Sequence, residues 1–267
     1  MTSTPTFECL QLDLDGGLAT LTLDRPDRGN AMDPQLSREL RDAALFLTYD
    51  PRVRAVLLKA NGKLFSGGGD LATFASSGPD ELPRIVDSMT VDLHAAIARL
   101  AKMDAPLVAA VTGSAGGAGM SLVAACDLVI AGRSAKFTMG YTKAGLVPDG
   151  TSSFFLSRVV GLRRALDLVL TNRVLTAEEA EDWGLVSRVV DDDAVISEAT
   201  ALARQLADGP TKAFGLAKRV IYAGANSALE EAMERESAAI AIAAATSDAH
   251  EGIAAFLGKR APSYQGR

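Results

Sequence analysis

Asp149 is the acidic residue whose sequence context is best suited to chemistry. It lies between Pro148 and Gly150 in the segment GLVPDGTSSF, residues 145–154. Proline presets φ, and aspartate and glycine tolerate tight conformations, so an ordinary turn accounts for the pattern. Such a turn would also hold one carboxylate still, and the hydroxyl-rich run after it opens a helix that Asp149 could cap. Three interpretations stay open: a turn residue, a helix N-cap, or the acid that reacts.

Two glycine-rich loops accompany this acid, FSGGGDL at 65–71 and GSAGGAGMSLVAAC at 113–126. Neither has the Gly-Lys-Ser/Thr ending of a phosphate-binding loop, and the second lacks a downstream ribose-binding acid in a clear βαβ frame. Taken singly, each is explained by a tight strand-to-helix turn. Taken together, two loops that follow buried strands and open helices can direct backbone N–H groups at one carbonyl oxygen. The pair predicts an oxyanion-stabilising site.

Hydrophobic periodicity predicts the elements that would position these residues. Strands are expected at 18–24, 53–60, 107–113 and 127–132, with a short strand-like SRVV near 187–190. Helices are expected at 33–49, 83–102, 151–160, 162–171, 176–182, 193–207, 210–224 and 228–246. Strands and helices alternate first, and helices accumulate from Thr151 onward. The order predicts an α/β core, residues 1–195, followed by a helical C-terminal region, residues 196–267.

Composition argues against several classes of function. The net charge is −6, whereas a general nucleic-acid surface needs clustered Lys and Arg. The cysteines and histidines (Cys9, Cys126, His94 and His250) are too few for a metal site, so none is expected. The N-terminus lacks the regions of a signal peptide, and no apolar stretch reaches the roughly 20 residues of a membrane span. We expect a soluble cytoplasmic protein with neither a nucleic-acid nor a membrane partner.

Ordered motifs along nearly the whole chain resemble those of one family. They are LTLDRPDRGNAM, KLFSGGGDL, AAVTGSAGGAGMSLVAACDLVIAGRSAKF, LTAEEAEDWGLVSRVV and the C-terminal HEGIAAFLGKRAPSYQGR. The family is the crotonase superfamily, also called the enoyl-CoA hydratase/isomerase family. The resemblance implies a crotonase-like spiral of ββα units with a helical C-terminal trimerisation region. It also implies assembly as a homotrimer or a dimer of trimers, and an acyl-CoA substrate whose coenzyme A serves in place of a separate cofactor.

The resemblance also implies roles for individual residues. The backbone N–H groups of Gly69 and Ala118 would be the oxyanion donors for a thioester enolate. Residues matching positions that bind coenzyme A or the substrate are Arg28, Ala31, Gly67, Asp70, Leu71, Tyr141, Phe256 and Lys259. In the family, the C-terminal positions often approach coenzyme A from a neighbouring subunit. Helix capping is at least as good an explanation of Asp70.

The sequence departs from the hydratases of this family at both of their catalytic glutamates. Ser121 and Tyr141 stand at those positions, and neither is a general base near neutral pH without strong activation. Asp149 instead matches the single acid of the family's double-bond isomerases, and the segments IAGRSAKF and GLVPD resemble the ring-epoxyphenylacetyl-CoA isomerases. One carboxylate suffices to move a proton from C2 to C4. Isomerisation with Asp149 as acid and base is therefore the expected activity, with walls from Leu146, Val147, Phe154 and Phe155.

Three alternatives remain beside isomerisation. The segment LRRALDLVLTNRVLTAEEAEDWGLVSRV also resembles the 4-chlorobenzoyl-CoA dehalogenases, in which Asp149 would be a nucleophile and His94 a helping histidine. The aromatic residues that enclose the ring in those enzymes are replaced here by Gly69, Leu93 and Tyr141. Hydration is the second alternative, and a non-catalytic acyl-CoA-binding scaffold is the third. His250 is expected to be structural.

Overall fold

A six-stranded sheet forms the centre of the protein in the computed structural model, which describes residues 4–267. The strand order is β1-β2-β3-β5-β7-β10, antiparallel between β1 and β2 and parallel elsewhere. Its strands are β1 (Leu10–Asp15), β2 (Leu18–Leu23), β3 (Ala55–Ala60), β5 (Leu107–Val111), β7 (Leu128–Gly132) and β10 (Arg188–Val190). The prediction of an α/β fold is confirmed.

A second, four-stranded sheet has the order β4-β6-β8-β9. Its strands are β4 (Leu64–Ser66), β6 (Ser114–Gly116), β8 (Lys136–Thr138) and β9 (Leu175–Thr176). The first three are parallel, and only β9 is antiparallel to its neighbour. None of these four strands was predicted from the sequence, and neither was β1. Segments of two or three residues are too short to display an alternating pattern, which explains the omission of the small sheet.

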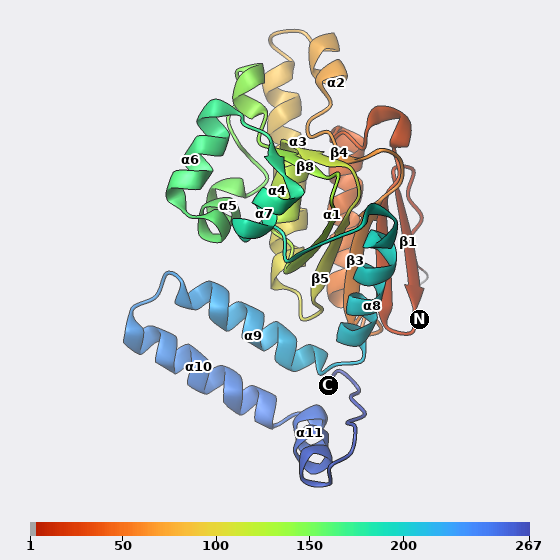
Figure 1. Ribbon diagram of the computed structural model, residues 1–267, viewed down its shortest axis with the longest axis vertical. Helices are drawn as coiled ribbons and strands as arrows, with labels where there is room; N and C mark the ends of the chain where they lie inside the picture. Colours follow the sequence, from red (N-terminus) through yellow and green to blue (C-terminus); the bar gives the residue numbers. More distant parts are fainter. Residues whose placement is uncertain (1–3) are drawn as a thin grey trace.

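Helices cover both faces of the large sheet (Figure 1). They are α1 (Pro34–Tyr49), α2 (Leu71–Ser76), α3 (Leu82–Lys102), α4 (Ala118–Ala124), α5 (Ser152–Val160), α6 (Leu162–Thr171), α7 (Ala177–Asp182), α8 (Val195–Ala207), α9 (Thr211–Gly224), α10 (Leu229–Ala244) and α11 (Ser247–Leu257). Short 3₁₀ helices are η1 (Pro26–Arg28), η2 (Tyr141–Ala144) and η3 (Asp192–Ala194). Within residues 4–267, no helix is long and apolar enough to cross a membrane.

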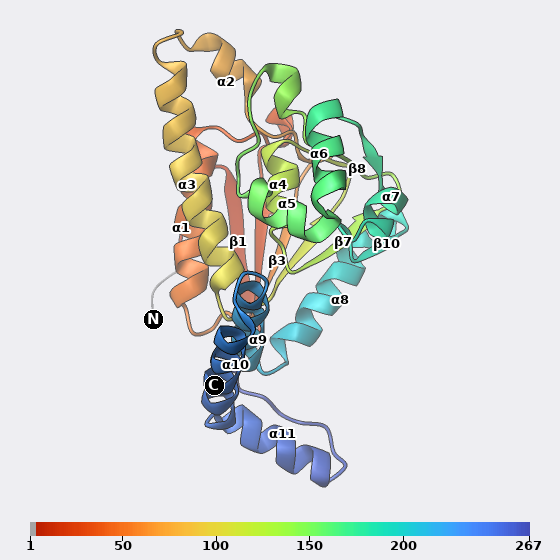
Figure 2. The same ribbon diagram turned by 90° about the vertical axis from the view of Figure 1, so that its left-hand side faces the viewer.

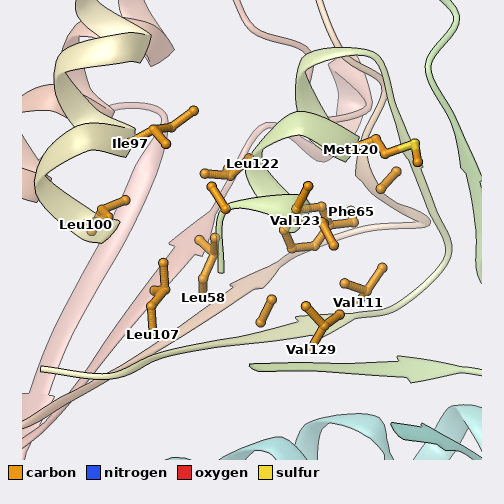
Figure 3. Packing of buried hydrophobic residues seen from close by; sticks show 14 of the residues in the cluster. Leu58, Phe65, Ile97, Leu100, Leu107, Val111, Met120, Leu122, Val123 and Val129 are labelled. Carbon is orange, nitrogen blue, oxygen red and sulfur yellow. The ribbon is translucent and has the colours of Figure 1, made fainter. Parts of the chain in front are cut away.

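The buried strands are apolar on both faces because each face has its own core. In β3, Val56 and Leu58 belong to the core that α1 and α3 cover, whereas Ala55 and Leu57 belong to the core beneath α8. Figure 3 shows the first core near Leu58, where α3 and α4 bring their apolar residues against β3, β5 and β7. The continuous apolar run at 53–60 follows from this double coverage.

The last three helices extend away from the sheets (Figure 2). α9 and α10 lie side by side, and α10 has no buried residue within this chain. The apolar side chains exposed on these helices are Ile221, Leu229, Met233, Ile240, Ile242, Ile253, Phe256 and Leu257. Helix α8, which begins at the expected boundary of 195, packs on the large sheet instead. The division at 195/196 stays a prediction.

A buried ion pair ties α9 to the core. Lys218 of α9 lies 2.6 Å from Asp127, and both side chains are largely buried. Asp127 also accepts hydrogen bonds from the backbone N–H of Leu107 at 2.8 Å and from the Tyr222 hydroxyl at 3.3 Å. Burial raises the pKa of Asp127, and the ammonium group of Lys218 opposes that shift. The lysine is therefore the charge that compensates Asp127 in the interior.

Removing this compensation should destabilise the protein. We expect Lys218→Met to lower the free energy of unfolding by about 3–5 kcal/mol, because it leaves a buried carboxylate unpaired. Urea unfolding measures the change. Lys212→Met, on the same helix, is the matched control: Lys212 pairs with Asp104 at 3.0 Å in a more exposed setting, so its loss should cost less than about 1 kcal/mol. Equal losses of unfolding free energy in the two variants would contradict the conclusion that Lys218 compensates the buried charge of Asp127.

Candidate active site

Two neighbouring parallel strands bring the glycine loops together. β4 and β6 pair in parallel, so the loops that follow them leave from the same edge of the small sheet. Gly68 has φ +92°, and a Cβ atom there would lie 2.8 Å from the carbonyl oxygen of Gly116 and 3.3 Å from the backbone nitrogen of Ala118. The two loops are therefore in direct backbone contact, with no room for a side chain between them.

The predicted oxyanion donors, Gly69 and Ala118, lie on these touching loops. Ala118 is the first residue of α4, where backbone N–H groups have no intrahelical acceptor. Within residues 4–267, neither the N–H of Gly69 nor that of Ala118 has a hydrogen-bond acceptor. A Cβ at Gly69 would lie 2.9 Å from the ring of Phe74. The structure thus brings together two free donors, as an oxyanion site requires.

Both donors line a pocket of about 350 Å³. Its walls are mostly apolar and come from α2, α3, η2 and the two glycine loops. The lining residues are Met32, Ser37, Gly67, Gly69, Leu71, Phe74, Val86, Met89, Thr90, Leu93, Gly116, Gly117, Ala118, Thr138, Gly140, Tyr141, Ala144, Leu146, Val147 and Asp149. Among them, Asp149 is the sole carboxylate, and none is a lysine, arginine or histidine. The pocket therefore combines two N–H donors with one acid.

Asp149 is held by two hydroxyl groups, one on each carboxylate oxygen. Tyr141 donates to Oδ1 at 2.6 Å, and Thr90 donates to Oδ2 at 3.1 Å. The side chain does not cap α5, because Thr151 occupies the N-cap place and makes no side-chain capping bond. The N-cap interpretation is therefore wrong. The backbone carbonyl of Asp149 does accept from Ser152 at 3.1 Å, so the turn fixes the main chain while the carboxylate faces the pocket.

Tyr141 and Ser121, the residues at the hydratase glutamate positions, form a second part of this network. The Ser121 hydroxyl lies 3.1 Å from the Tyr141 hydroxyl, and Ser121 is fully buried. Burial, followed by the negative charge of Asp149, strongly raises the pKa of Tyr141. The phenol therefore stays protonated and acts as a hydrogen-bond donor, and neither residue supplies a base.

Among the residues matched to positions that bind coenzyme A or the substrate, Gly67 and Leu71 line this pocket, and Asp70 lies between them on the first glycine loop. The segment after η1 contacts the first glycine loop, since Met32 N donates to Gly68 O and Asp70 N donates to Met32 O. The Asp70 carboxylate caps α2 through the N–H groups of Ala72 and Thr73, each at 3.1 Å. This confirms the capping explanation of Asp70, and it leaves a ligand role as a prediction.

Arginines flank the same carboxylate at longer range. Arg25 and Arg28 approach Asp70 Oδ2 at 3.7 and 3.8 Å, and this oxygen has no hydrogen-bond donor among residues 4–267. The Arg28 side chain is largely exposed, whereas Ala31 is buried. The Arg28 guanidinium is therefore accessible to an anionic ligand. Its contact with coenzyme A stays a prediction.

Several candidate residues lie elsewhere. Phe256 is 84% exposed on α11, and neither it nor Lys259 lines the pocket. His94 and His250 are both exposed and outside the pocket. Within the described chain, no three His, Cys, Asp or Glu side chains gather as a metal site requires.

Of the four residues expected as pocket walls, the two aliphatic ones are confirmed and the two aromatic ones are wrong. Leu146 and Val147 line the pocket, but Phe154 and Phe155 do not. Phe155 is buried and packs edge-on against Tyr222, with ring centroids 5.6 Å apart. Phe154 is exposed instead, and the guanidinium of Arg158 lies over its ring, 3.7 Å from the centroid.

Thr90 is the contact that sequence reasoning missed. It lies within α3, and nothing in the local sequence IVDSMTVDL, residues 85–93, distinguishes it from a surface threonine. Its partner is 59 residues away in the sequence. Only the packing of α3 against the segment that carries Asp149 reveals the pair.

Comparison with known proteins gives a consistent picture. A model of the enoyl-CoA hydratase/isomerase family matches residues 13–267. The 1,2-epoxyphenylacetyl-CoA isomerase of Escherichia coli K12 is 36% identical over 261 residues, which cover 98% of this chain and 100% of that protein. The 4-chlorobenzoyl coenzyme A dehalogenase-2 of an Arthrobacter species is 38% identical over 220 residues, covering 82% of this chain and 80% of that protein.

Solved structures agree with these matches. An enoyl-CoA hydratase from Polaromonas sp. JS666 superposes with a TM-score of 0.90 at 32% identity, covering 96% of this chain and 99% of that one. The relatives thus include an isomerase, a dehalogenase and a hydratase, and all are named for coenzyme A esters. On the family match and this coverage, the chain belongs to the enoyl-CoA hydratase/isomerase family, the crotonase superfamily that its motifs resemble.

Proposed function

We propose that this enzyme moves a carbon–carbon double bond in an enoyl-CoA thioester, with Asp149 as the acid and base. The observation that carries the proposal is that Asp149 is the sole carboxylate lining the pocket, beside the free N–H groups of Gly69 and Ala118. Water addition in this family's hydratases uses two glutamates, and Ser121 and Tyr141 stand at their positions here. A 1,3-proton shift needs one acid.

The reaction proceeds in two proton transfers. Asp149 removes a proton from C2 of a 3-enoyl-CoA, and the electron pair of the broken C–H bond forms an enolate on the thioester. The N–H groups of Gly69 and Ala118 stabilise the negative oxygen, an arrangement worth several kcal/mol. Asp149 then returns its proton to C4, and the double bond lies between C2 and C3. No other cofactor takes part, since coenzyme A belongs to the substrate.

The coenzyme A moiety extends from this pocket over the first glycine loop. Arg28 and Ala31 flank it on one side, and Gly67, Asp70 and Leu71 hold the adenine end. Phe256 lies on the exposed helix α11 and Lys259 in the turn after it, so we propose that they complete the site of a neighbouring subunit in a trimer or dimer of trimers. A cytoplasmic location is consistent with such a substrate.

Replacing the acid tests the proposal directly. We expect Asp149→Asn to lose at least about a hundredfold in kcat on a 3-enoyl-CoA, the lower range for general acid–base catalysis, because the amide cannot take up the proton. Binding of the coenzyme A ester should persist, since the amide keeps the shape of the carboxylate. Absorbance of the conjugated product measures the rate, and calorimetry measures binding. A variant with the parental rate would reduce Asp149 to a turn residue.

Incubation with other coenzyme A esters separates the alternative functions. A 4-chlorobenzoyl-CoA substrate that leaves an acyl ester on Asp149 would make it a nucleophile and this enzyme a dehalogenase. Tight binding of acyl-CoA esters with neither turnover nor exchange of their C2 protons would make it a binding scaffold. Mass spectrometry of the esters and of the intact protein distinguishes these outcomes.

Hydration should be slow or absent. Ser121 and Tyr141, whose pKa is strongly raised by burial, cannot activate water as two glutamates would. We expect crotonyl-CoA to yield no 3-hydroxybutyryl-CoA beyond the uncatalysed background, measured by mass spectrometry with a preparation that isomerises 3-enoyl-CoA. Rapid hydration by that preparation would show that water is activated without either glutamate.

Assembly is tested by light scattering. The exposed apolar residues of α10 and α11 predict self-association, because burial stabilises such surface, and the family resemblance makes a trimer or a dimer of trimers the expected assembly. We expect Ile240→Glu to weaken the assembly, since Ile240 is 69% exposed on α10. Glu236→Gln, on the same helix, is the control and should leave the mass unchanged. A parent protein that is monomeric at micromolar concentration would contradict the proposal.

A further inference from the structure

Three hydroxyl groups from three different elements surround the carboxylate of Asp149. Thr90 comes from α3, Ser121 from α4 and Tyr141 from η2. Two of them bond the carboxylate directly, one to each oxygen, and Ser121 bonds Tyr141. The two oxygens therefore have different partners, and the difference bears on which of them reacts.

The direction of the hydrogen bonds follows from proton counting. A phenol has one proton, and Tyr141 places it on Asp149 Oδ1 at 2.6 Å. The phenol proton is then unavailable for the 3.1 Å contact with Ser121, so in that contact only Ser121 can donate, and the Ser121 hydroxyl also has the Gly117 carbonyl oxygen as an acceptor at 3.3 Å. The short contact with Asp149 places the phenol proton on Oδ1, and Oδ1 keeps this donor.

The donor at Oδ2 is different in kind. The hydroxyl of Thr90 rotates about its Cβ–Oγ bond, and a threonine inside a helix has a second acceptor in the carbonyl four residues back. In α3 that carbonyl belongs to Val86. The 3.1 Å contact of Thr90 with Oδ2 is also longer than the phenol contact with Oδ1. Thr90 can therefore release Oδ2 when this oxygen takes up a proton.

We infer that Tyr141 and Thr90 are positioning residues that make Oδ2 of Asp149 the oxygen carrying the transferred proton. The inference rests on the proposed function. The C2–H bond breaks, its electron pair enters the enolate, and the proton forms the Oδ2–H bond. Thr90 then turns toward its own helix. When Oδ2 gives its proton to C4, the carboxylate is restored and Thr90 donates to Oδ2 again. Tyr141 holds Oδ1 in place throughout.

The experiment compares kcat and KM of four variants on 3-hexenoyl-CoA. We expect Tyr141→Phe to lower kcat roughly 10- to 100-fold, the scale of a misplaced reacting group, with KM within about twofold. Thr90→Val should lower kcat by a smaller factor, because Oδ1 stays anchored. Thr90→Ser, which keeps the hydroxyl, should restore the parental kcat. Ser121→Ala should lower kcat less than Tyr141→Phe, because the phenol keeps its bond to Asp149.

Tyr222→Phe is the matched control. Tyr222 also donates to a partly buried aspartate, Asp127, but it lies outside the pocket. The control should lose stability comparable to Tyr141→Phe, measured as a shift in Tm, with an unchanged kcat. A parental kcat in Tyr141→Phe overturns the inference. So does a Tyr141→Phe variant in which only KM rises, or a Thr90→Ser variant that is no better than Thr90→Val.

Exchange of the C2 protons of butyryl-CoA with heavy water separates this inference from the proposed function. This exchange needs Asp149 and the stabilised enolate, but it does not need a carbon–carbon double bond in the acyl chain of the substrate. If the parent protein exchanges these protons without isomerising 3-hexenoyl-CoA, the isomerase proposal fails, and the exchange rates of the same variants decide the inference. If the parent neither exchanges nor isomerises, both fail.

Discussion

The backbone contact between the two glycine loops is the constraint on which the rest of the site depends. A single methyl group at Gly68 would lie 2.8 Å from the Gly116 carbonyl oxygen, so no side chain can stand there without pushing the loops apart. Keeping the N–H groups of Gly69 and Ala118 close together requires β4 and β6 to be adjacent and parallel, which they are. The small sheet therefore has a positional role that its short strands alone would not suggest. It sets where the donors lie.

The large sheet and its helices make that position rigid. Both faces of β3 are buried, one against α1 and α3 and the other against α8, and close packing of this kind has low compressibility. The acid is placed by the same means. Thr90 reaches Asp149 from α3, which packs on the large sheet, whereas Tyr141 follows β8 of the small sheet. A relative shift of the two sheets would change both hydrogen bonds, so the core holds the geometry of the carboxylate.

The sequence predicted the features that depend on local pattern. The four apolar strands, most of the helices and the capping role of Asp70 follow from periodicity and turn chemistry, and the glycine motifs at residues 65–71 and 113–126 located both donor loops. The short strands and the Thr90 contact could not be found in this way, because pairing and packing between distant segments determine them. Phe154 and Phe155 were misplaced for a related reason. Their rings follow the direction of α5, which the local sequence does not specify.

The replacement of acids by hydroxyl groups around Asp149 has an electrostatic consequence. A second carboxylate at the place of the Tyr141 hydroxyl, 2.6 Å from Oδ1, would put two like charges in one site, and one of them would have to hold a proton. A phenol at that place donates a hydrogen bond instead. Burial and the charge of Asp149 keep it protonated, so it remains a donor to the charged carboxylate. The pocket is thereby organised around a single carboxylate, which is the one acid–base group that the proposed transfer between two carbon atoms needs.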